Sequence, residues 1–423
     1  MASSTLITSL LPGTLKIRST NRTMANQDGL HHFQWTQHNH FTFIDDGDGF
    51  YRDVIQAIDQ AHHWVAIEMY LVKSGTVMSQ LVESLCHAAK RGVTVQLLFD
   101  ALGSKGLSHR DTVQLRAADC QLHLFNPPRT GSLSRLNWFH RDHRKLILID
   151  QHIAFVGGAG LADEFSPQLQ NNQHWDDFMV MIYGPCVHQW QTLFRAAWPA
   201  APAPEPPTTQ RMPPTHGEKG RVSYSEGLRT SSMHVTLTQR IHNAEHTLWM
   251  VTPYFHPSLK MRRALIQAAK RQVDVRIIVP GKHIDHSTVR ALTIWHYPKL
   301  LKAGVKIYEY QPRFIHAKGL LVDHWVSVGS CNMDRWTDQW NREANQEIEG
   351  EESLNNYRAR FQQWMEDSLY LSQEVWSKQS AFMRLINYCI ASVVLFIETR
   401  LYLHPRERKR QRKHHDRRLS ERA

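Results

Sequence analysis

The chain contains an internal repeat, which limits the folds open to it more than any other feature. The segment HAAKRGVTVQLLFD, residues 87–100, aligns with QAAKRQVDVRIIVP, residues 267–280, at an offset of 180 positions. Both segments are typical of an amphipathic helix end, a short turn and a β-branched strand buried on both faces. Two further pairs flank this one in the same order: residues 62–72 with 245–255, and 116–127 with 301–312. The sequence therefore predicts a duplicated fold.

Each copy of the repeat is expected to form strand, helix, strand, helix, strand. This alternation predicts two α/β units with mainly parallel strands. The length of 423 residues agrees with two halves, because a single hydrophobic core usually stops growing well below that size. We expect the halves to pack about a pseudo-twofold axis, which would bring equivalent positions of the two copies together.

A proline-rich stretch separates the two copies. Residues 198–220 contain seven prolines, which are incompatible with a helix or a central strand and predict a stiff, extended linker. The predicted organisation is a disordered lead-in at 1–39, a first half at 40–198, a linker at 199–220, a second half at 221–368 and a tail at 369–423.

The tail differs from both halves in composition. Residues 385–397 form an uncharged stretch of 13 residues, which is too short to span a bilayer as a helix. A dense basic block, RERKRQRKHHDRR, follows at 406–418. An apolar helix beside a basic cluster is typical of an interfacial anchor on anionic lipid. The alternatives are a core helix packed on the second half and a solvated tail.

Two segments carry the spacing H-x-K-x4-D, once in each copy of the repeat. The first contains His143, Lys145 and Asp150, and the second contains His316, Lys318 and Asp323. Residues i and i+2 of a strand point to the same face, so each His and its Lys should project together. Convergence of the two pairs would make one site with two imidazoles and two ammonium groups.

Such a site suits a phosphodiester. Two ammonium groups neutralise the charge that builds on the non-bridging oxygens in the transition state. One imidazole attacks phosphorus to form a phosphohistidine, and the other protonates the leaving alcohol and then deprotonates the incoming one. The lysines supply the positive charge that a metal would give, so we expect no metal and no other cofactor.

The paired motifs and the duplication resemble the phospholipase D superfamily over nearly all of residues 40–368. The resemblance implies two tandem α/β/α sandwich halves and a catalytic set of His143, Lys145, Asp150, His316, Lys318 and Asp323. Asp150 and Asp323 are expected to be structural rather than catalytic. Family members also carry a Gly-Ser-x-Asn element after each motif and an acidic residue about 30 positions on. This sequence matches with Ser330, Asn332, Asp177 and Glu343, whereas Gly160 replaces the first-half asparagine.

Within the superfamily the sequence is similar to bacterial cardiolipin synthases of the shorter B-type, which lack N-terminal transmembrane helices. The segments FVGGAGLADEF and DHWVSVGSCNMDRW carry much of this similarity. It implies transfer of a phosphatidyl group from phosphatidylglycerol to another lipid hydroxyl, with release of glycerol. We expect a peripheral protein on the cytoplasmic side of the inner membrane, bound to anionic phospholipid.

Three alternatives remain open. A net charge of +11 fits a nuclease of the same superfamily equally well, but the basic block is distal and not interleaved with aromatic residues around the motifs, so we expect no nucleic acid partner. A phospholipase D that hydrolyses lipids would use the same residues. A catalytically inactive lipid-binding protein is the third alternative.

Other patterns in the sequence are assigned structural roles. The run DDGDG at 45–49 resembles a calcium loop without its glutamate, so a helix N-cap is preferred. The histidine-rich segments lack the cysteines of a zinc site. Most of the 13 Trp and 12 Tyr residues are assigned to the core or a membrane interface, and no stacking platform is assigned.

Overall fold

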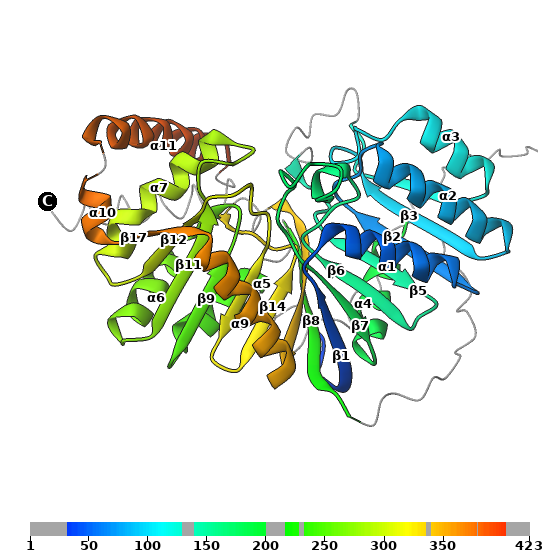
Figure 1. Ribbon diagram of the computed structural model, residues 1–423, viewed down its shortest axis with the longest axis horizontal. Coiled ribbons are helices and arrows are strands. Elements are labelled where there is room, and N and C mark those ends of the chain that lie inside the picture. Colours follow the sequence, from blue (N-terminus) through cyan, green and yellow to red (C-terminus); the bar gives the residue numbers. More distant parts are fainter. Residues whose placement is uncertain are drawn as a thin grey trace, which may run out of the picture.

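The chain folds into one large mixed sheet with helices packed on it, as the computed structural model in Figure 1 shows. The structure describes residues 32–128, 139–199, 216–227, 232–335, 340–378 and 380–402. The elements of the first half are β1 (Thr36–Ile44), α1 (Gly47–Asp59), β2 (Trp64–Met69), α2 (Thr76–Lys90), β3 (Thr94–Asp100), α3 (His109–Ala117), β4 (Gln121–Phe125), β5 (Lys145–Ile149), β6 (Ile153–Gly157), the 3₁₀ helix η3 (Asp163–Phe165), β7 (Met179–Tyr183) and α4 (Cys186–Ala197).

The second half largely repeats this order, with two further short strands within it and three further elements at its end. Its elements are β8 (Glu218–Glu226), α5 (Ser232–His242), β9 (Thr247–Val251), β10 (Phe255–His256), α6 (Leu259–Lys270), β11 (Asp274–Pro280), α7 (Ser287–Leu301), β12 (Lys306–Tyr310), β13 (Gly319–Val322), β14 (Trp325–Gly329), β15 (Met333–Asp334), β16 (Arg342–Glu349), α9 (Glu351–Glu366), β17 (Ser368–Leu371), α10 (Gln373–Lys378) and α11 (Ala381–Tyr402).

The strand order confirms the duplicated α/β fold. The first half runs β4-β3-β2-β5-β6-β7-β1, and the second runs β12-β11-β9-β13-β14-β16-β8, so each strand of one run has a counterpart in the other. Strands β10 and β15 pair separately in a small two-stranded sheet. The two sequences of strands meet where β1 pairs with β8 at the centre of the molecule (Figure 1). Strand β17 pairs with β12 and extends the sheet at the edge of the second half.

The expectation of mainly parallel strands was wrong for the middle of the sheet. Strands β2, β3 and β4 pair in parallel, as do β9, β11 and β12, because helices connect them. Strands β5 and β6, and likewise β13 and β14, are antiparallel. The chain reverses directly between them at Asp150, Gln151 and Asp323, which have positive φ values of 47°, 62° and 51°. Such tight reversals produce hairpins and cannot connect parallel strands.

Local sequence signals explain where several helices begin. Asp46 caps α1, since its carboxylate accepts from the backbone N–H groups of Asp48 at 3.2 Å and Gly49 at 2.9 Å. The DDGDG run is therefore a helix N-cap, as expected. Ser108 and Ser258 cap α3 and α6 in the same way. These side chains satisfy N–H groups that a helix leaves unpaired in its first turn.

Three apolar cores hold the helices on the sheet. One core lies under α1, α2 and α3 of the first half, and its counterpart lies under α5, α6 and α7 of the second. The third runs across the junction and contains buried side chains of α4 and α9, including Trp190 and Trp364. The halves therefore share a continuous core, which restricts their relative movement.

Some predicted boundaries need correction. Phe33 donates its backbone N–H to Val222 at 2.9 Å, and β1 begins at Thr36, so the sheet includes residues assigned to the lead-in. Strand β8 begins at Glu218, inside the predicted linker. Pairing of β17 with β12 likewise joins the first residues of the predicted tail to the second half. The rest of the lead-in (1–31), most of the linker (200–215) and the basic block lie outside the described residues.

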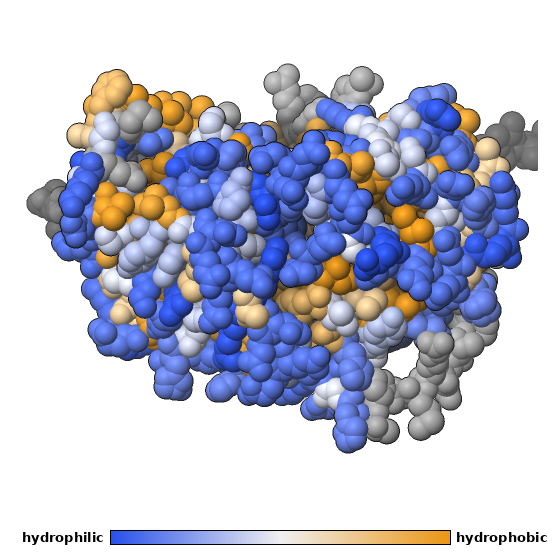
Figure 2. All heavy atoms as spheres, in the orientation of Figure 1, coloured by the Kyte–Doolittle hydropathy of each residue, from blue (hydrophilic) through white to orange (hydrophobic). Residues whose placement is uncertain are grey.

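The last described helix, α11, packs on α7 with one face only. Tyr388 lies edge-on to Trp295 of α7 with ring centroids 5.1 Å apart, and Ala391 is fully buried. The opposite face exposes Phe382, Leu385 and Val393, with Phe396 further along, each more than half exposed. Apolar side chains gather over α11 at the upper left of Figure 2. None of the described helices has the length and apolar character needed to cross a membrane.

Candidate active site

The two motifs meet at the junction because their backbones are hydrogen-bonded to the opposite half. The N–H of His143 donates to the carbonyl of Arg342 at 2.9 Å, and the N–H of His316 donates to the carbonyl of Asp176 at 2.7 Å. Each carbonyl belongs to the residue that precedes a candidate carboxylate. The segment before β5 thus lies against the first residue of β16, and the segment before β7 lies against the one before β13. The site is therefore assembled from both halves in a reciprocal arrangement.

His143 is held by a carboxylate of the second half. Its Nδ1 lies 2.9 Å from Oε1 of Glu343 and 3.2 Å from the carbonyl oxygen of Ser330. Two acceptors at Nδ1 favour the tautomer with the proton on Nδ1, which leaves the Nε2 lone pair free. Burial raises the pKa of Glu343, but the attraction of His143 and Lys145 is stronger and holds this pKa below its ordinary value. Glu343 therefore remains ionised.

His316 is held by a carboxylate of the first half. Its Nδ1 lies 2.7 Å from Oδ2 of Asp177, which is almost fully buried. Burial raises the pKa of Asp177 to about 6, although Lys318 opposes this shift. Burial also lowers the pKa of His316 well below its ordinary value, and the nearby lysines lower it further. The resting imidazole is therefore neutral.

The two motif lysines place concentrated positive charge beside the imidazoles. The ammonium of Lys145 donates to the carbonyl of His143 at 2.7 Å, and that of Lys318 lies 3.0 Å from Nε2 of His316. Burial, followed by repulsion from Lys318, lowers the pKa of Lys145 to about 7. Burial lowers the pKa of Lys318 to about 8, against the attraction of nearby carboxylates. A bound phosphodiester anion would offset the effect of burial, raise the pKa of each lysine and keep both lysines charged.

Removing the ammonium of Lys145 is expected to stabilise the lipid-free protein. In the unfolded chain this amine stays protonated to about pH 10. Between pH 7 and 10 the unfolded state thus binds more protons, and the contribution of Lys145 to the free energy of unfolding rises with pH. Lys145→Met should raise Tm at pH 7 by about 2 °C, with a smaller gain near pH 10. Calorimetry tests this.

The matched control for that experiment is Lys219→Met. The Lys219 side chain is 38% exposed and is paired with Glu349 at 2.8 Å, so its loss should change Tm little at either pH. A lower Tm for Lys145→Met than for the wild type at pH 7 would contradict the prediction. A gain of equal size at both pH values would do the same.

The motif aspartates do not join the catalytic groups. Asp150 follows β5 and accepts hydrogen bonds from the backbone N–H groups of His62, His63 and Trp64. Asp323 makes the equivalent three bonds to the turn before β9. Both aspartates lie at the opposite end of their strand from the motif lysine. These contacts are those of the structural role expected for both aspartates, since each one anchors a helix-to-strand turn.

The Gly-Ser-x-Asn element is present in one half only, and the packing explains why. Asn332 is buried, and its Oδ1 has no hydrogen-bond partner in the part of the chain that the structure describes. At Gly160 a Cβ would lie 2.7 Å from the carbonyl oxygen of Leu71, so no side chain fits there. At Gly158, the counterpart of Ser330, a Cβ would lie 2.4 Å from the Asp177 carboxylate. The site is therefore asymmetric about its pseudo-twofold axis.

The sequence did not point to the aromatic residues near the histidines, because most tryptophans and tyrosines were expected in the core or at a membrane interface. Tyr70 lies 4.8 Å from the His143 ring. Phe165, Trp175 and Phe314 surround the other histidine at centroid distances of 5.3 to 5.7 Å. Two of them had an available signal, since Trp175 precedes the candidate carboxylate by two residues and Phe314 precedes the motif histidine by two.

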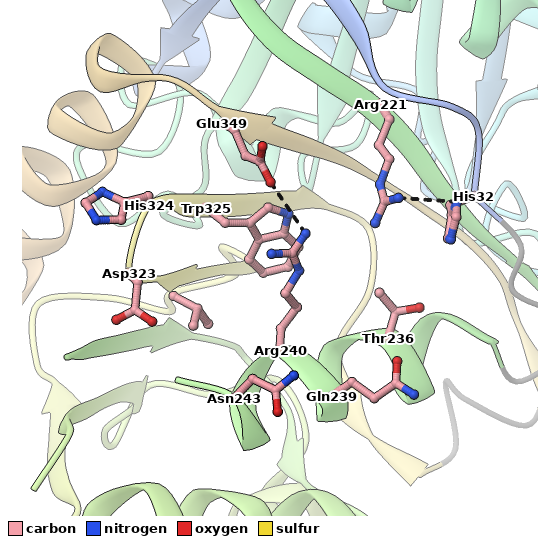
Figure 3. A pocket seen from close by; sticks show the side chains of 11 residues that line it. His32, Arg221, Thr236, Gln239, Arg240, Asn243, Asp323, His324, Trp325 and Glu349 are labelled. Atoms are coloured by element: carbon pink, nitrogen blue, oxygen red, sulfur yellow. Dashed lines mark hydrogen bonds and ion pairs between the residues drawn. The ribbon is translucent and has the colours of Figure 1, made fainter. Parts of the chain in front are cut away.

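A pocket of about 480 Å³ in the second half lies outside this site (Figure 3). Its walls come from β8, α5 and the β13–β14 turn, and it contains none of the motif histidines or lysines. Arg240 is stacked on Trp325 and ion-paired with Glu349 at 3.5 Å.

Within the described ranges no group of three or more His, Cys, Asp or Glu side chains is arranged to hold a metal ion.

Comparison with known proteins places this geometry in a family. The family model described as "Cardiolipin synthase, PLD-like domain" matches residues 54–198 and 237–365, more than half of the chain. Cardiolipin synthase A of Pseudomonas fluorescens is 31% identical over 313 residues, which cover 72% of this chain and 64% of that protein. A cardiolipin synthase of Alkalihalophilus pseudofirmus is 30% identical over 351 residues, covering 81% and 69%. The chain thus spans about two thirds of the length of these relatives.

A solved structure agrees on the fold. The crystal structure of phosphatidylserine synthase from Haemophilus influenzae has a TM-score of 0.63 to this chain at 14% identity, and the match covers 85% of this chain and 93% of that one. At that identity the likeness supports the two-half architecture and nothing finer. With the family match over both halves, the conclusion is plain: the chain belongs to the family of cardiolipin synthases with phospholipase D-like domains.

Proposed function

We propose that the protein is a cardiolipin synthase-like phosphatidyltransferase. It moves a phosphatidyl group from phosphatidylglycerol to a hydroxyl of a second phospholipid and releases glycerol. The observation that carries the proposal is the reciprocal pairing of each motif histidine with a carboxylate of the other half, beside two buried lysines. This arrangement suits two-step displacement at a phosphodiester and fits the family to which the chain belongs.

The geometry supports a covalent mechanism. The Nε2 atom of one imidazole attacks phosphorus, and the bond to the glycerol oxygen breaks. The second imidazole takes up a proton at Nε2 when the phosphodiester anion binds beside it, and it gives that proton to the departing alkoxide. A lipid hydroxyl then passes its proton to the second imidazole while its oxygen attacks phosphorus, and the P–N bond breaks. Lys145 and Lys318 stabilise the negative charge on the non-bridging oxygens in both steps. Both histidines are regenerated at the end.

The first experiment uses purified full-length protein and phosphatidylglycerol in mixed micelles, with and without a chelator, followed by lipid chromatography. We expect cardiolipin and an equal amount of released glycerol, at a rate that the chelator does not change. Formation of phosphatidic acid without cardiolipin would contradict the proposal and show that the protein is a hydrolase. No lipid turnover, together with cleavage of nucleic acid, would favour the nuclease alternative.

Membrane binding through α11 is a second part of the proposal. Exposed side chains recur on it at intervals of three and four residues, which puts Phe382, Leu385, Cys389 and Val393 along one face. The basic block that follows in the sequence complements an anionic lipid surface. Helix α11 also contacts α7, which itself contacts β10 beside the segment that carries Asn332. We therefore propose a peripheral association with an anionic bilayer on the cytoplasmic side, and no nucleic acid partner.

Glutamate substitutions on that face are expected to release the protein from lipid. Leu385→Glu combined with Val393→Glu places two charges where the apolar face would enter the bilayer. In a flotation assay with phosphatidylglycerol-containing vesicles, we expect the bound fraction to fall about tenfold. The control is Val113→Glu on α3, where the side chain is also exposed, at 49%. Equal flotation of the α11 variant and the control would contradict this part of the proposal.

A further inference from the structure

The imidazole of His316 lies in an aromatic wall, defined here as Phe165, Trp175 and Phe314. Their ring centroids lie 5.6, 5.3 and 5.7 Å from that of His316. The Trp175 ring also contacts the other two, with its centroid 5.5 Å from that of Phe165 and 5.1 Å from that of Phe314. Phe165 and Phe314 are at most 5% exposed, whereas Trp175 is partly exposed and forms the accessible part of the wall.

No equivalent wall exists around the other motif histidine among the residues that the structure describes. Two positions before that histidine, where the second half has Phe314, the first half has Arg141, bonded to the backbone and to Asp100. Two positions before the carboxylate, Trp175 is replaced by Asn341, whose amide donates to Glu343. The two histidines are thus related by the repeat, but their aromatic neighbours differ. Three rings lie beside His316, whereas His143 has the Tyr70 ring at 4.8 Å and polar side chains at the two equivalent positions.

This asymmetry gives the two sides of the reacting phosphorus different surroundings. In an in-line displacement the nucleophilic imidazole lies on one side, and the alcohol lies on the other beside the acid–base imidazole. Water competes with the acceptor alcohol for that second position. When water attacks phosphorus in place of the alcohol, the product is phosphatidic acid. Aromatic faces offer water no strong hydrogen-bond partner, yet they pack well against the C–H groups of a lipid glycerol.

We propose that the aromatic wall is the alcohol-side subsite, which excludes water beside His316 and so commits the phosphatidyl group on His143 to a lipid hydroxyl. The inference rests on the proposed transferase function and adds a residue-level basis for transfer over hydrolysis. It also assigns the nucleophile: Nε2 of His143 bonds to phosphorus, and His316 passes the proton from the acceptor hydroxyl. With water as acceptor the same steps release phosphatidic acid and restore both imidazoles.

The test is the ratio of phosphatidic acid to cardiolipin formed by one enzyme sample in phosphatidylglycerol micelles. Trp175→Ala and Phe165→Leu each open the wall and should raise this ratio about tenfold. Trp175→Phe keeps an aromatic face and should leave the ratio close to that of the wild type. Because both products come from the same active molecules, loss of folded protein does not change the ratio.

Trp249→Leu is the matched control for an aromatic core substitution. Trp249 is 8% exposed and stacks on Phe361 at 5.2 Å in the core that runs across the junction. Its replacement should lower stability and leave the product ratio unchanged. A ratio that rises equally in Trp249→Leu would show that any loosening of the protein admits water, and it would overturn the specific role of the wall.

The outcomes separate this inference from the function on which it rests. In one outcome the wild type forms cardiolipin, and the ratio of phosphatidic acid to cardiolipin in both Trp175→Ala and Phe165→Leu stays within twofold of the wild-type ratio. That result overturns the proposed role of the aromatic wall and leaves the transferase function intact. Absence of cardiolipin from the wild type overturns both. Should Trp175→Ala give no product at all, Phe165→Leu decides the question by the same ratio.

Discussion

Replacing either His143 or His316 by alanine is expected to lower the rate of cardiolipin formation by about 10⁴-fold or more. One imidazole forms the bond to phosphorus and the other moves the proton, so neither step proceeds at a useful rate without its group. The double variant should form cardiolipin only slightly more slowly than the less active single variant, because the two histidines act as one unit. Initial rates in phosphatidylglycerol micelles measure all three.

Mass spectrometry of trapped protein distinguishes the two roles. In His316→Ala both steps are slowed because the acid–base group is missing. After an incubation long enough for the first step, a phosphatidyl adduct on the peptide that contains His143 should accumulate and persist after quenching. His143→Ala should carry none. An adduct on His316 in the second variant would reverse the assignment of nucleophile and would contradict the proposed alcohol-side wall. Retention of more than one tenth of the wild-type rate in either variant would refute the covalent mechanism itself.

Neutralising either carboxylate that holds a histidine is the change with the next largest expected effect. In Glu343→Gln the amide replaces an acceptor 2.9 Å from Nδ1 of His143, and in Asp177→Asn it replaces one 2.7 Å from Nδ1 of His316. Either amide can present its N–H₂ to the ring and favour the wrong tautomer, with the proton on Nε2. We expect kcat to fall about 10³-fold in each variant, while the affinity for lipid changes little.

The control for this pair lies on the same strand as Glu343. Glu347 is also fully buried and is bonded to Arg221 at 2.8 Å and to Trp325 at 3.2 Å, and neither partner belongs to the site. Glu347→Gln should reduce stability and leave kcat per folded molecule nearly unchanged. If Glu343→Gln behaves like this control, with lower Tm and normal kcat, then Glu343 serves packing and not orientation of the imidazole.

Much of the fold follows from the repeat and its local signals. The helix–turn–strand segments aligned at residues 87–100 and 267–280 form the end of α2 with β3 and the end of α6 with β11. The cap at Asp46 was also predictable, because the interaction is confined to neighbouring residues. The antiparallel centre of the sheet could not be predicted in this way, since strand direction there depends largely on pairing with partners distant in the sequence.

The candidate site likewise has features that the sequence predicts and features that it does not. The two H-x-K-x4-D motifs could be identified without a structure, because His and Lys two residues apart share a face of an extended chain. Asp177 and Glu343 could be matched to a family role, but their pairing could not: each carboxylate holds the histidine of the other half, about 140 and 200 positions away.

The sequence alone determined that the chain is duplicated, that each copy carries one imidazole and one ammonium at a strand end, and that the protein suits a phosphodiester. Only the tertiary structure decided that the halves complete each other's site and that Phe165, Trp175 and Phe314 enclose one histidine and not the other. The reason is physical. Periodicity and spacing report interactions within a few residues, whereas these contacts form only when two copies of the fold pack across a junction.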